Sequence, residues 1–325
     1  MITKQPALLQ LRDNLEKVII GQSKLVDRLL ISILTGGHLL LEGPPGLAKT
    51  TAVKALANSI HAEFQRIQFT PDLLPADLTG GEIYDPEKRQ FEFIKGPIFN
   101  EIILADEINR APPKIQSALL EAMQEHQVTI NGITRALPPL FIVMATQNPL
   151  EQSGTYPLPE AQLDRFLLHT QLDYPSTDNE LTILKQDRVR YQKNPLETDI
   201  QLNESQIKPE HILNERQIVA DTHIDEKLEK YIVELVSVTR NPEIINPDYK
   251  DYVDYGASPR ASLALYKAAS AMAYLNDRDY LIPEDIHNII HDVLRHRIIL
   301  NYAASANHLS VDRLIDELVK SVATP

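Results

Sequence analysis

The sequence contains no cysteine and no tryptophan among its 325 residues. The absence of cysteine excludes disulfide scaffolds, cysteine-ligated zinc sites, iron–sulfur clusters and thiol nucleophiles. No segment approaches the ~20 consecutive apolar residues that a membrane-spanning helix requires. The N-terminal segment MITKQPALLQLRDNLEK lacks the apolar core of a secretory signal. These absences favour a soluble protein of the cytoplasm.

Glycine is also scarce: it occupies 11 positions, whereas an average composition has about 7% glycine. All of these residues except Gly256 lie at or before Gly154. Glycine is typical of positions with a positive φ or with a close approach between backbone and ligand. The distribution therefore predicts special backbone conformations in the first half of the chain and packed helices in the second.

Basic residues are outnumbered, with 32 lysines and arginines against 45 aspartates and glutamates and a formal net charge of −13. This charge disfavours general binding to nucleic acid or to an anionic membrane, although a local basic patch stays open. The composition, with 43% hydrophobic and 24% charged residues, is that of a globular protein. The length predicts about two domains.

The first half alternates short apolar runs with helical patterns, which predicts an α/β fold with a parallel sheet. The predicted strands are residues 38–41, 64–69, 102–105, 140–145 and 166–172. A helix opened by Pro112 and Pro113 carries an apolar stripe as far as Met123. Asn131-Gly132, between two β-prone segments, predicts a hairpin.

The pattern of apolar and polar residues changes after residues 174–178. Residues 191–210 are polar and irregular, and from about residue 211 nearly every pattern is helical. We therefore predict a sheet domain over residues 1–178 and a helical domain over residues 179–325.

The strongest motif is GPPGLAKT at residues 43–50, which follows a predicted strand and opens a predicted helix. Successive backbone N–H groups at a helix N-terminus form an anion cradle. Lys49 is expected to reach the β and γ phosphates of a nucleotide, and the Thr50 hydroxyl to hold Mg²⁺. The usual pattern has glycine in place of Ala48, and we expect the methyl group of Ala48 to demand a negative φ.

Two further strands end in polar residues. Asp106 and Glu107 follow an apolar strand, and as neighbouring strand residues their carboxylates should point in opposite directions. Asp106 then suits Mg²⁺, and Glu107 suits the attacking water. Asn148 follows a third strand, at the edge where open α/β sheets bind ligands; a simple Asn-Pro turn is the alternative there.

Taken together, five segments make the chain resemble the MoxR family of AAA+ ATPases over about residues 15–300. The segments are GPPGLAKT, LADEINRAPPKIQSALLEAMQEHQV, MATQNP, LPEAQLDRF and GASPRASLAL. That family shares the alanine seen here at position 48. The resemblance implies a P-loop AAA+ core, with a parallel five-stranded sheet flanked by helices, followed by an all-α lid.

The resemblance also assigns roles. It implies that ATP is bound by the Walker A loop and its surroundings, namely Gly43, Pro44, Pro45, Gly46, Leu47, Ala48, Lys49, Thr50, Thr51, Gln22 and Arg260. Thr50 and Asp106 would hold Mg²⁺. The catalytic residues would be Glu107, Lys49, Asn148 (sensor 1), Arg165 (an arginine finger for the neighbouring subunit) and Arg260 (sensor 2).

Two of these arginines have simpler alternatives. Arg165 could form a structural ion pair with Asp164 or Asp173, and Arg260 could be an ordinary surface residue. For Arg260 the local pattern supports the sensor role, because Ser258 and Pro259 predict a helix start that puts Arg260 in the first turn.

The function implied by the resemblance is ATP hydrolysis at the subunit interfaces of a hexameric ring that acts as a chaperone-like maturation factor for protein complexes. Partners with a von Willebrand factor A domain fit that family. Residues 70–97, which look loop-rich, and the hairpin at residues 131–132 would face the pore or the partner. Two alternatives stay open: a nucleotide-switched scaffold with little turnover, and a magnesium-chelatase-like or DNA-associated motor.

Overall fold

The computed structural model describes residues 6–148, 154–192 and 207–325, and it divides into two compact units. The sheet unit comprises residues 5–158 and 170–213, and the helical unit comprises residues 1–4, 159–169 and 214–325. Each unit is made of segments that alternate along the sequence, so these units are a different division from the two sequence domains. The domain boundary expected at residue 178 stays a prediction. Most of the expected irregular stretch, residues 193–206, lies outside the described residues.

A five-stranded sheet with the order β2-β5-β8-β1-β9 forms the centre of the sheet unit. Its strands are β1 (Leu39–Glu42), β2 (Phe64–Gln68), β5 (Ile102–Asp106), β8 (Ile142–Gln147) and β9 (Leu168–Gln171). The pairs β1–β8, β5–β8 and β2–β5 are parallel. The predicted α/β fold with a parallel sheet is thereby confirmed.

Strand β8 lies between β1 and β5 and pairs with both. Met144 is opposite Leu39 on one side and Leu104 on the other. Because the strands are parallel and level, their carboxyl ends reach one edge of the sheet. All three are nearly fully buried, which explains their almost uninterrupted apolar sequences.

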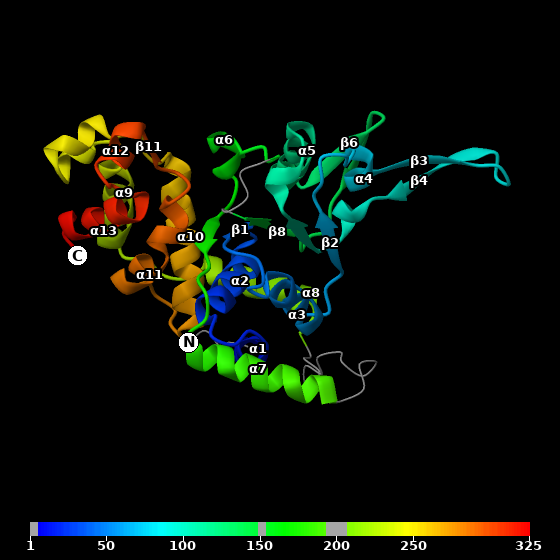
Figure 1. Cartoon of the computed structure of the whole chain (residues 1–325), viewed down its shortest axis with the longest axis horizontal. Coiled ribbons are helices and arrows are strands. Elements are labelled where there is room, and N and C mark those ends of the chain that lie inside the picture. The colour runs from blue at the N-terminus through cyan, green and yellow to red at the C-terminus, as the bar shows by residue number, and fades with distance from the viewer. Residues whose placement is uncertain (1–5, 149–153, 193–206) are drawn as a thin grey trace. The chain divides into compact units, whose positions relative to one another are not determined.

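Helices cover both faces of this sheet (Figure 1), with α2 and α3 below it and α5 above it in that view. The helices of the sheet unit include α1 (Pro6–Val18), α2 (Ser23–Thr35), α3 (Lys49–Ser59), α5 (Pro113–Glu125) and α7 (Thr177–Gln192). The buried His38 ties α5 to the sheet. Its Nδ1 accepts the Val143 N–H at 3.0 Å, so Nε2 carries the proton that is donated to the Met123 carbonyl at 3.1 Å.

Two hairpins extend from the sheet unit. The sequence suggested that residues 70–97 are mainly loop, and this expectation is wrong. The segment forms α4 (Pro75–Thr79), β3 (Gly80–Asp85) and β4 (Gln90–Lys95), and the 3₁₀ turn η1 (Pro97–Phe99) begins at its end. The β3–β4 hairpin reaches well beyond its neighbours (Figure 1). The predicted second hairpin, β6 (Gln127–Ile130) and β7 (Ile133–Ala136), is confirmed. The Asn131 amide donates to Glu82 at 3.1 Å and so links the two hairpins.

The helical unit is built almost wholly of helices, as the sequence predicted. Its principal elements are α6 (Glu160–Leu163), α9 (Glu226–Val238), α10 (Pro259–Leu275), α11 (Pro283–Leu294), α12 (Tyr302–Ala306) and α13 (Val311–Ser321), with α8 (Pro209–Ala220) spanning the boundary between units. Turns η4 (Pro242–Ile244) and η5 (Pro247–Asp251) and the short strands β10 (Val253–Tyr255) and β11 (Ile299–Leu300) complete it. The alanine-rich α10 packs closely against α9 and α11.

The base of the β3–β4 hairpin leaves no room for a side chain at Gly96. A Cβ atom there would lie 2.5 Å from the Leu78 carbonyl oxygen and even closer to the Gly80 nitrogen. At Gly81 a Cβ would meet nothing within 4 Å. We therefore predict that Gly96→Ala lowers the free energy of unfolding by about 1–3 kcal/mol because backbone must move. Gly81→Ala should change it by less than about 0.5 kcal/mol. Denaturant unfolding measures both, and equal effects would contradict the prediction.

Candidate nucleotide-binding site

The loop at residues 43–48 joins the end of β1 to the start of α3. Ala48 stands directly before α3 with φ 54° and ψ 24°, in the left-handed region. The expectation that its methyl group demands a negative φ is therefore wrong. A left-handed conformation costs a residue with a Cβ about 1–2 kcal/mol, so the turn into α3 holds Ala48 against its own preference.

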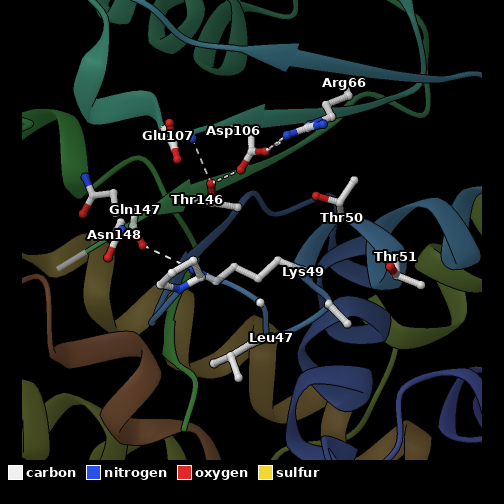
Figure 2. Close-up of a pocket in the computed structure, with 13 residues that line it drawn as sticks. Leu47, Lys49, Thr50, Thr51, Arg66, Asp106, Glu107, Thr146, Gln147 and Asn148 are labelled. Atoms are coloured by element: carbon white, nitrogen blue, oxygen red, sulfur yellow. Dashed lines mark hydrogen bonds and ion pairs between the residues drawn. The ribbon is translucent and has the colours of Figure 1, made fainter. Parts of the chain in front are cut away.

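Lys49 opens α3 and reaches back across the loop. Its ammonium donates to the Gly43 carbonyl and, at 3.4 Å, to the Gln147 carbonyl at the end of β8 (Figure 2). Burial lowers the pKa of Lys49, while the charges of Asp106, Glu42 and Glu107 act in the opposite direction. An anion beside this ammonium would stabilise its charged form.

Asp106, the last residue of β5, has contacts on both carboxylate oxygens. Thr146 of β8 donates its hydroxyl to Oδ1 at 2.5 Å. Arg66 of β2 contacts Oδ2 through Nη2 at 2.6 Å and Nε at 3.0 Å. Figure 2 shows these side chains converging from three neighbouring strands.

Glu107 is not the next residue of the strand, as the sequence suggested. It has φ 57° and ψ 50° and precedes the 3₁₀ turn η2 (Ile108–Arg110). Its N–H donates to the Thr146 hydroxyl at 2.9 Å. Its carboxylate accepts from the Gln68 amide at 2.8 Å and from Arg110 Nε at 3.0 Å. The two acids are thus separated by a left-handed backbone turn rather than by the alternation of a strand.

These groups line one cavity of about 500 Å³. Its walls are formed by Pro45, Gly46, Leu47, Ala48, Lys49, Thr50, Thr51, Arg66, Asp106, Glu107, Thr146, Gln147 and Asn148. The loop, the paired acids and the amide, which the sequence placed in three distant segments, therefore meet at the carboxyl edge of the sheet. Gly43, the first residue of the loop, accepts a hydrogen bond from Lys49 through its carbonyl.

A second cavity of about 220 Å³ shares Gly46, Leu47, Ala48 and Thr51 with the first, so the two adjoin. Most of its remaining lining is apolar and comes from the end of α1 and the turn after it, from the residues before α7 and from α7 itself: Val18, Ile19, Ile20, Gln22, Pro175, Ile183, Gln186 and Asp187. A mostly apolar slot beside an anion cradle has the character of a base-binding pocket. Gln22 donates its side-chain amide to the Asp173 carbonyl at 2.9 Å and so braces the pocket wall.

Arg165 and Arg260 both belong to the helical unit, whereas the two cavities belong to the sheet unit. Arg260 lies in the first turn of α10, whose predicted cap Ser258 accepts the Arg260 N–H at 3.3 Å. Arg165 follows α6 and is half-buried. Asp164 forms its close ion pair with Arg297, Nε to Oδ1 at 2.8 Å.

Two family models match the chain. One describes the ATPase family associated with various cellular activities (AAA) and covers residues 38–168; the other describes the AAA lid domain and covers residues 248–318. The chain is 45% identical to Chaperone MoxR1 of Mycobacterium tuberculosis over 313 residues, 96% of this chain and 81% of that one. The chain belongs to the MoxR family of AAA+ ATPases.

Two further relatives cover nearly their full lengths. YeaC of Bacillus subtilis, an uncharacterised protein, is 44% identical over 98% of this chain and 95% of its own. A crystal structure of a candidate ATPase from Cytophaga hutchinsonii aligns with a TM-score of 0.89 and 46% identity, over 98% of this chain and 95% of that one. Membership of the MoxR family makes this chain a nucleotide-binding ATPase.

The donor set suits the metal that usually accompanies ATP. Thr50 and Asp106 line the same cavity and offer a hydroxyl and a carboxylate, and hard oxygen donors of this kind are what Mg²⁺ prefers. Few protein ligands are needed, because phosphate oxygens and waters complete its shell.

Several site residues carried no recognisable signal in the sequence. Arg66, Gln68 and Thr146 contact the paired acids. Polar residues within a strand do not by themselves predict a binding site, so the sequence did not identify these three. The α7 residues of the apolar cavity, Ile183, Gln186 and Asp187, lie in a segment that carries no motif, so the sequence offered no signal for them. In the described residues no helix is long and apolar enough to cross a membrane.

The strained alanine gives a direct test. We predict that Ala48→Gly raises the free energy of unfolding by up to about 1 kcal/mol, because glycine adopts the left-handed conformation without penalty but loses more chain entropy. The same change at Ala55, buried within α3, should lower it by about 1 kcal/mol or more. Thermal unfolding of both variants measures the difference, and a decrease for Ala48→Gly would show that the turn is not strained.

Proposed function

We propose that the chain is a subunit of a ring, hexameric by family resemblance, that hydrolyses ATP at its subunit interfaces. The observation that carries this proposal is the meeting of the phosphate loop, the two acids and Asn148 in one cavity. The proposed lid spans residues 179–325 and the proposed core residues 1–178.

Each residue has a proposed role at the phosphates. The N–H groups of residues 46–50 and the Lys49 ammonium hold the β and γ phosphates, since Pro44 and Pro45 have no N–H to donate. Thr50 and Asp106 hold Mg²⁺, which when bound offsets the negative charge of those phosphates. Glu107 accepts a proton from the attacking water, and Asn148 orients that water or a γ-phosphate oxygen. Arg260 contacts the γ-phosphate of its own subunit, and Arg165 reaches the ATP of the neighbour.

Glu107 must leave its present partners to act as a base. Its carboxylate oxygen Oε2 is occupied by contacts with Gln68 and Arg110, which a water would have to replace before it could give up a proton there. We infer that nucleotide binding rearranges these contacts. This same feature also favours the alternative of a nucleotide-switched scaffold with little turnover, so the two must be separated by experiment.

The biological role is proposed from the relatives. One of them is named a chaperone, and we propose a chaperone-like role for this chain in the remodelling or maturation of protein complexes, in the cytoplasm. Partners with a von Willebrand factor A domain are proposed on the family resemblance. The net charge of −13 supports protein rather than nucleic-acid partners.

The choice between enzyme and scaffold rests on Glu107. We expect Glu107→Gln to bind ATP within a few-fold of the wild-type affinity but to release phosphate about 10²–10⁴-fold more slowly, because the amide cannot accept the proton. Glu125→Gln, the same change at an exposed position on α5, should be unaffected. Phosphate release and equilibrium nucleotide binding measure both. If wild type and Glu107→Gln are equally inactive while both bind ATP, the enzyme proposal fails.

The ring proposal rests on Arg165. Arg165→Ala should still bind ATP but lose about 10³–10⁵-fold in turnover, the usual effect of removing an arginine finger. Arg313→Ala, at a more exposed arginine of the helical unit, should retain full activity. Mass measurement of Glu107→Gln in ATP should reveal a closed oligomer. A chain that stays monomeric in ATP would contradict a finger that acts in trans.

A further inference from the structure

The guanidinium of Arg297 contacts the residues on both sides of Arg165. Arg297 has a side chain only 3% exposed; its Nε donates to the Asp164 carboxylate at 2.8 Å and its Nη2 to the Phe166 carbonyl at 2.7 Å. Asp164 and Phe166 are the residues directly before and after Arg165. The rigid fork of Arg297 therefore fixes the backbone on both sides of Arg165.

The same guanidinium also contacts the last turn of α11. Its Nη1 donates to the Val293 carbonyl of α11 and, at 3.3 Å, to the Leu167 carbonyl. The neighbouring His296 contacts the Phe166 carbonyl at 3.1 Å. The segment that carries Arg165 is thus bound to α11 by buried polar contacts rather than held by its own short helix α6.

Asp164 extends this connection to the start of α10. Its Oδ2 accepts the Ser258 hydroxyl at 3.3 Å and lies 3.9 Å from Arg260 Nη1. Ser258 in turn accepts the N–H of Arg260 as the helix cap. A continuous chain of polar contacts therefore runs from Arg297 through Asp164 and Ser258 to Arg260.

The ion pair between Asp164 and Arg297 is not explained by a contribution to stability alone. An ion pair with a buried guanidinium gains little over well-packed apolar residues, but it fixes geometry, and losing one partner leaves an uncompensated charge. Asp164 uses one oxygen for Arg297 and the other for the start of α10. This division of contacts fits a residue that joins two segments.

We propose that Asp164 and Arg297 are positioning residues that hold Arg165 and Arg260 as one unit. The inference rests on the proposed function, in which Arg260 serves the ATP of its own subunit and Arg165 that of the neighbour. When Arg260 moves on loss of its γ-phosphate, Arg165 moves with it. The state of one site is thereby communicated to the next, which gives hydrolysis an order around the ring.

The first measurement is the turnover of Asp164→Asn, which keeps the size of the side chain and removes its charge. We expect phosphate release to fall by about 10²-fold, because an error of about 1 Å in catalytic geometry costs that much. A general loss of stability could also lower turnover. The matched control is therefore Asp285→Asn, which breaks the buried pair with Arg278 elsewhere in the unit and should unfold at lower temperature but retain its turnover.

Mixed rings separate a link between the arginines from an effect on Arg165 alone. Each variant is mixed in equal amounts with Glu107→Gln, whose own site is inactive but whose Arg165 is intact. Arg165→Ala should regain roughly a quarter of the wild-type rate, since half of the subunits have a working site and half of those face an intact finger. Arg260→Ala should regain none, because its defect lies in its own site.

The behaviour of Asp164→Asn in these mixtures decides the matter. No recovery, as for Arg260→Ala, supports the link, because its own site is impaired as well. Recovery equal to that of Arg165→Ala overturns the link, as does full activity of Asp164→Asn alone. Failure of Arg165→Ala itself to recover contradicts the finger in trans, and so the proposed function rather than the link.

Ser258 provides a milder variant in case Asp164→Asn does not fold. Ser258→Ala removes the hydroxyl that joins Asp164 to the Arg260 N–H, and with it the cap of α10, whereas Ser258→Thr keeps the hydroxyl for both contacts. We expect Ser258→Ala to lose turnover without recovery in mixed rings, and Ser258→Thr to retain turnover. Equal activity of the two variants would overturn the proposal.

Discussion

The pairing of β8 with both β1 and β5 is the constraint on which the candidate site depends. Met144 stands opposite Leu39 and Leu104 at once, so the three strands run level and end at one edge. Their order in the sheet differs from their order in the chain, and this difference places the strand before Asn148 between the phosphate loop and the paired acids. Thr146 of β8 then joins the two sides, donating to Asp106 and accepting from the Glu107 N–H.

Two left-handed residues that carry a side chain lie at this same edge. Ala48 and Glu107 are both left-handed, and each is the residue directly before a helical turn. Left-handed residues with a Cβ are uncommon and costly, and they persist where the surrounding structure determines the backbone. The left-handed conformation of Ala48 turns the loop into α3. That of Glu107 ends β5 and brings the Glu107 carboxylate to Gln68 and Arg110.

Two kinds of contact hold the helical unit together. Its helices form an apolar core, whereas the segment with Arg165 is held by charged and polar contacts to Arg297 and His296. Apolar packing tolerates small shifts, but the hydrogen bonds of a buried guanidinium are directional and favour one geometry. In the proposed function this unit presents Arg165 and Arg260 to phosphates, and one fixed geometry serves that role better than added stability does.

The amino-acid sequence by itself determined the alternation of strands and helices, the phosphate loop, the two acids and the hairpin at Asn131-Gly132, because each depends on local spacing and turn chemistry. It also carried the family resemblance, which the relatives confirm. Local rules failed at Ala48, where the tertiary turn overrides the preference of a methyl group, and at Glu107, which adopts a left-handed conformation and does not continue the alternation of the strand. Only the tertiary structure decided that Arg66, Gln68 and Thr146 surround the acids and that α7 lines the apolar cavity. Such contacts join residues tens of positions apart, and a pattern read along one segment holds no record of which strand will lie beside it.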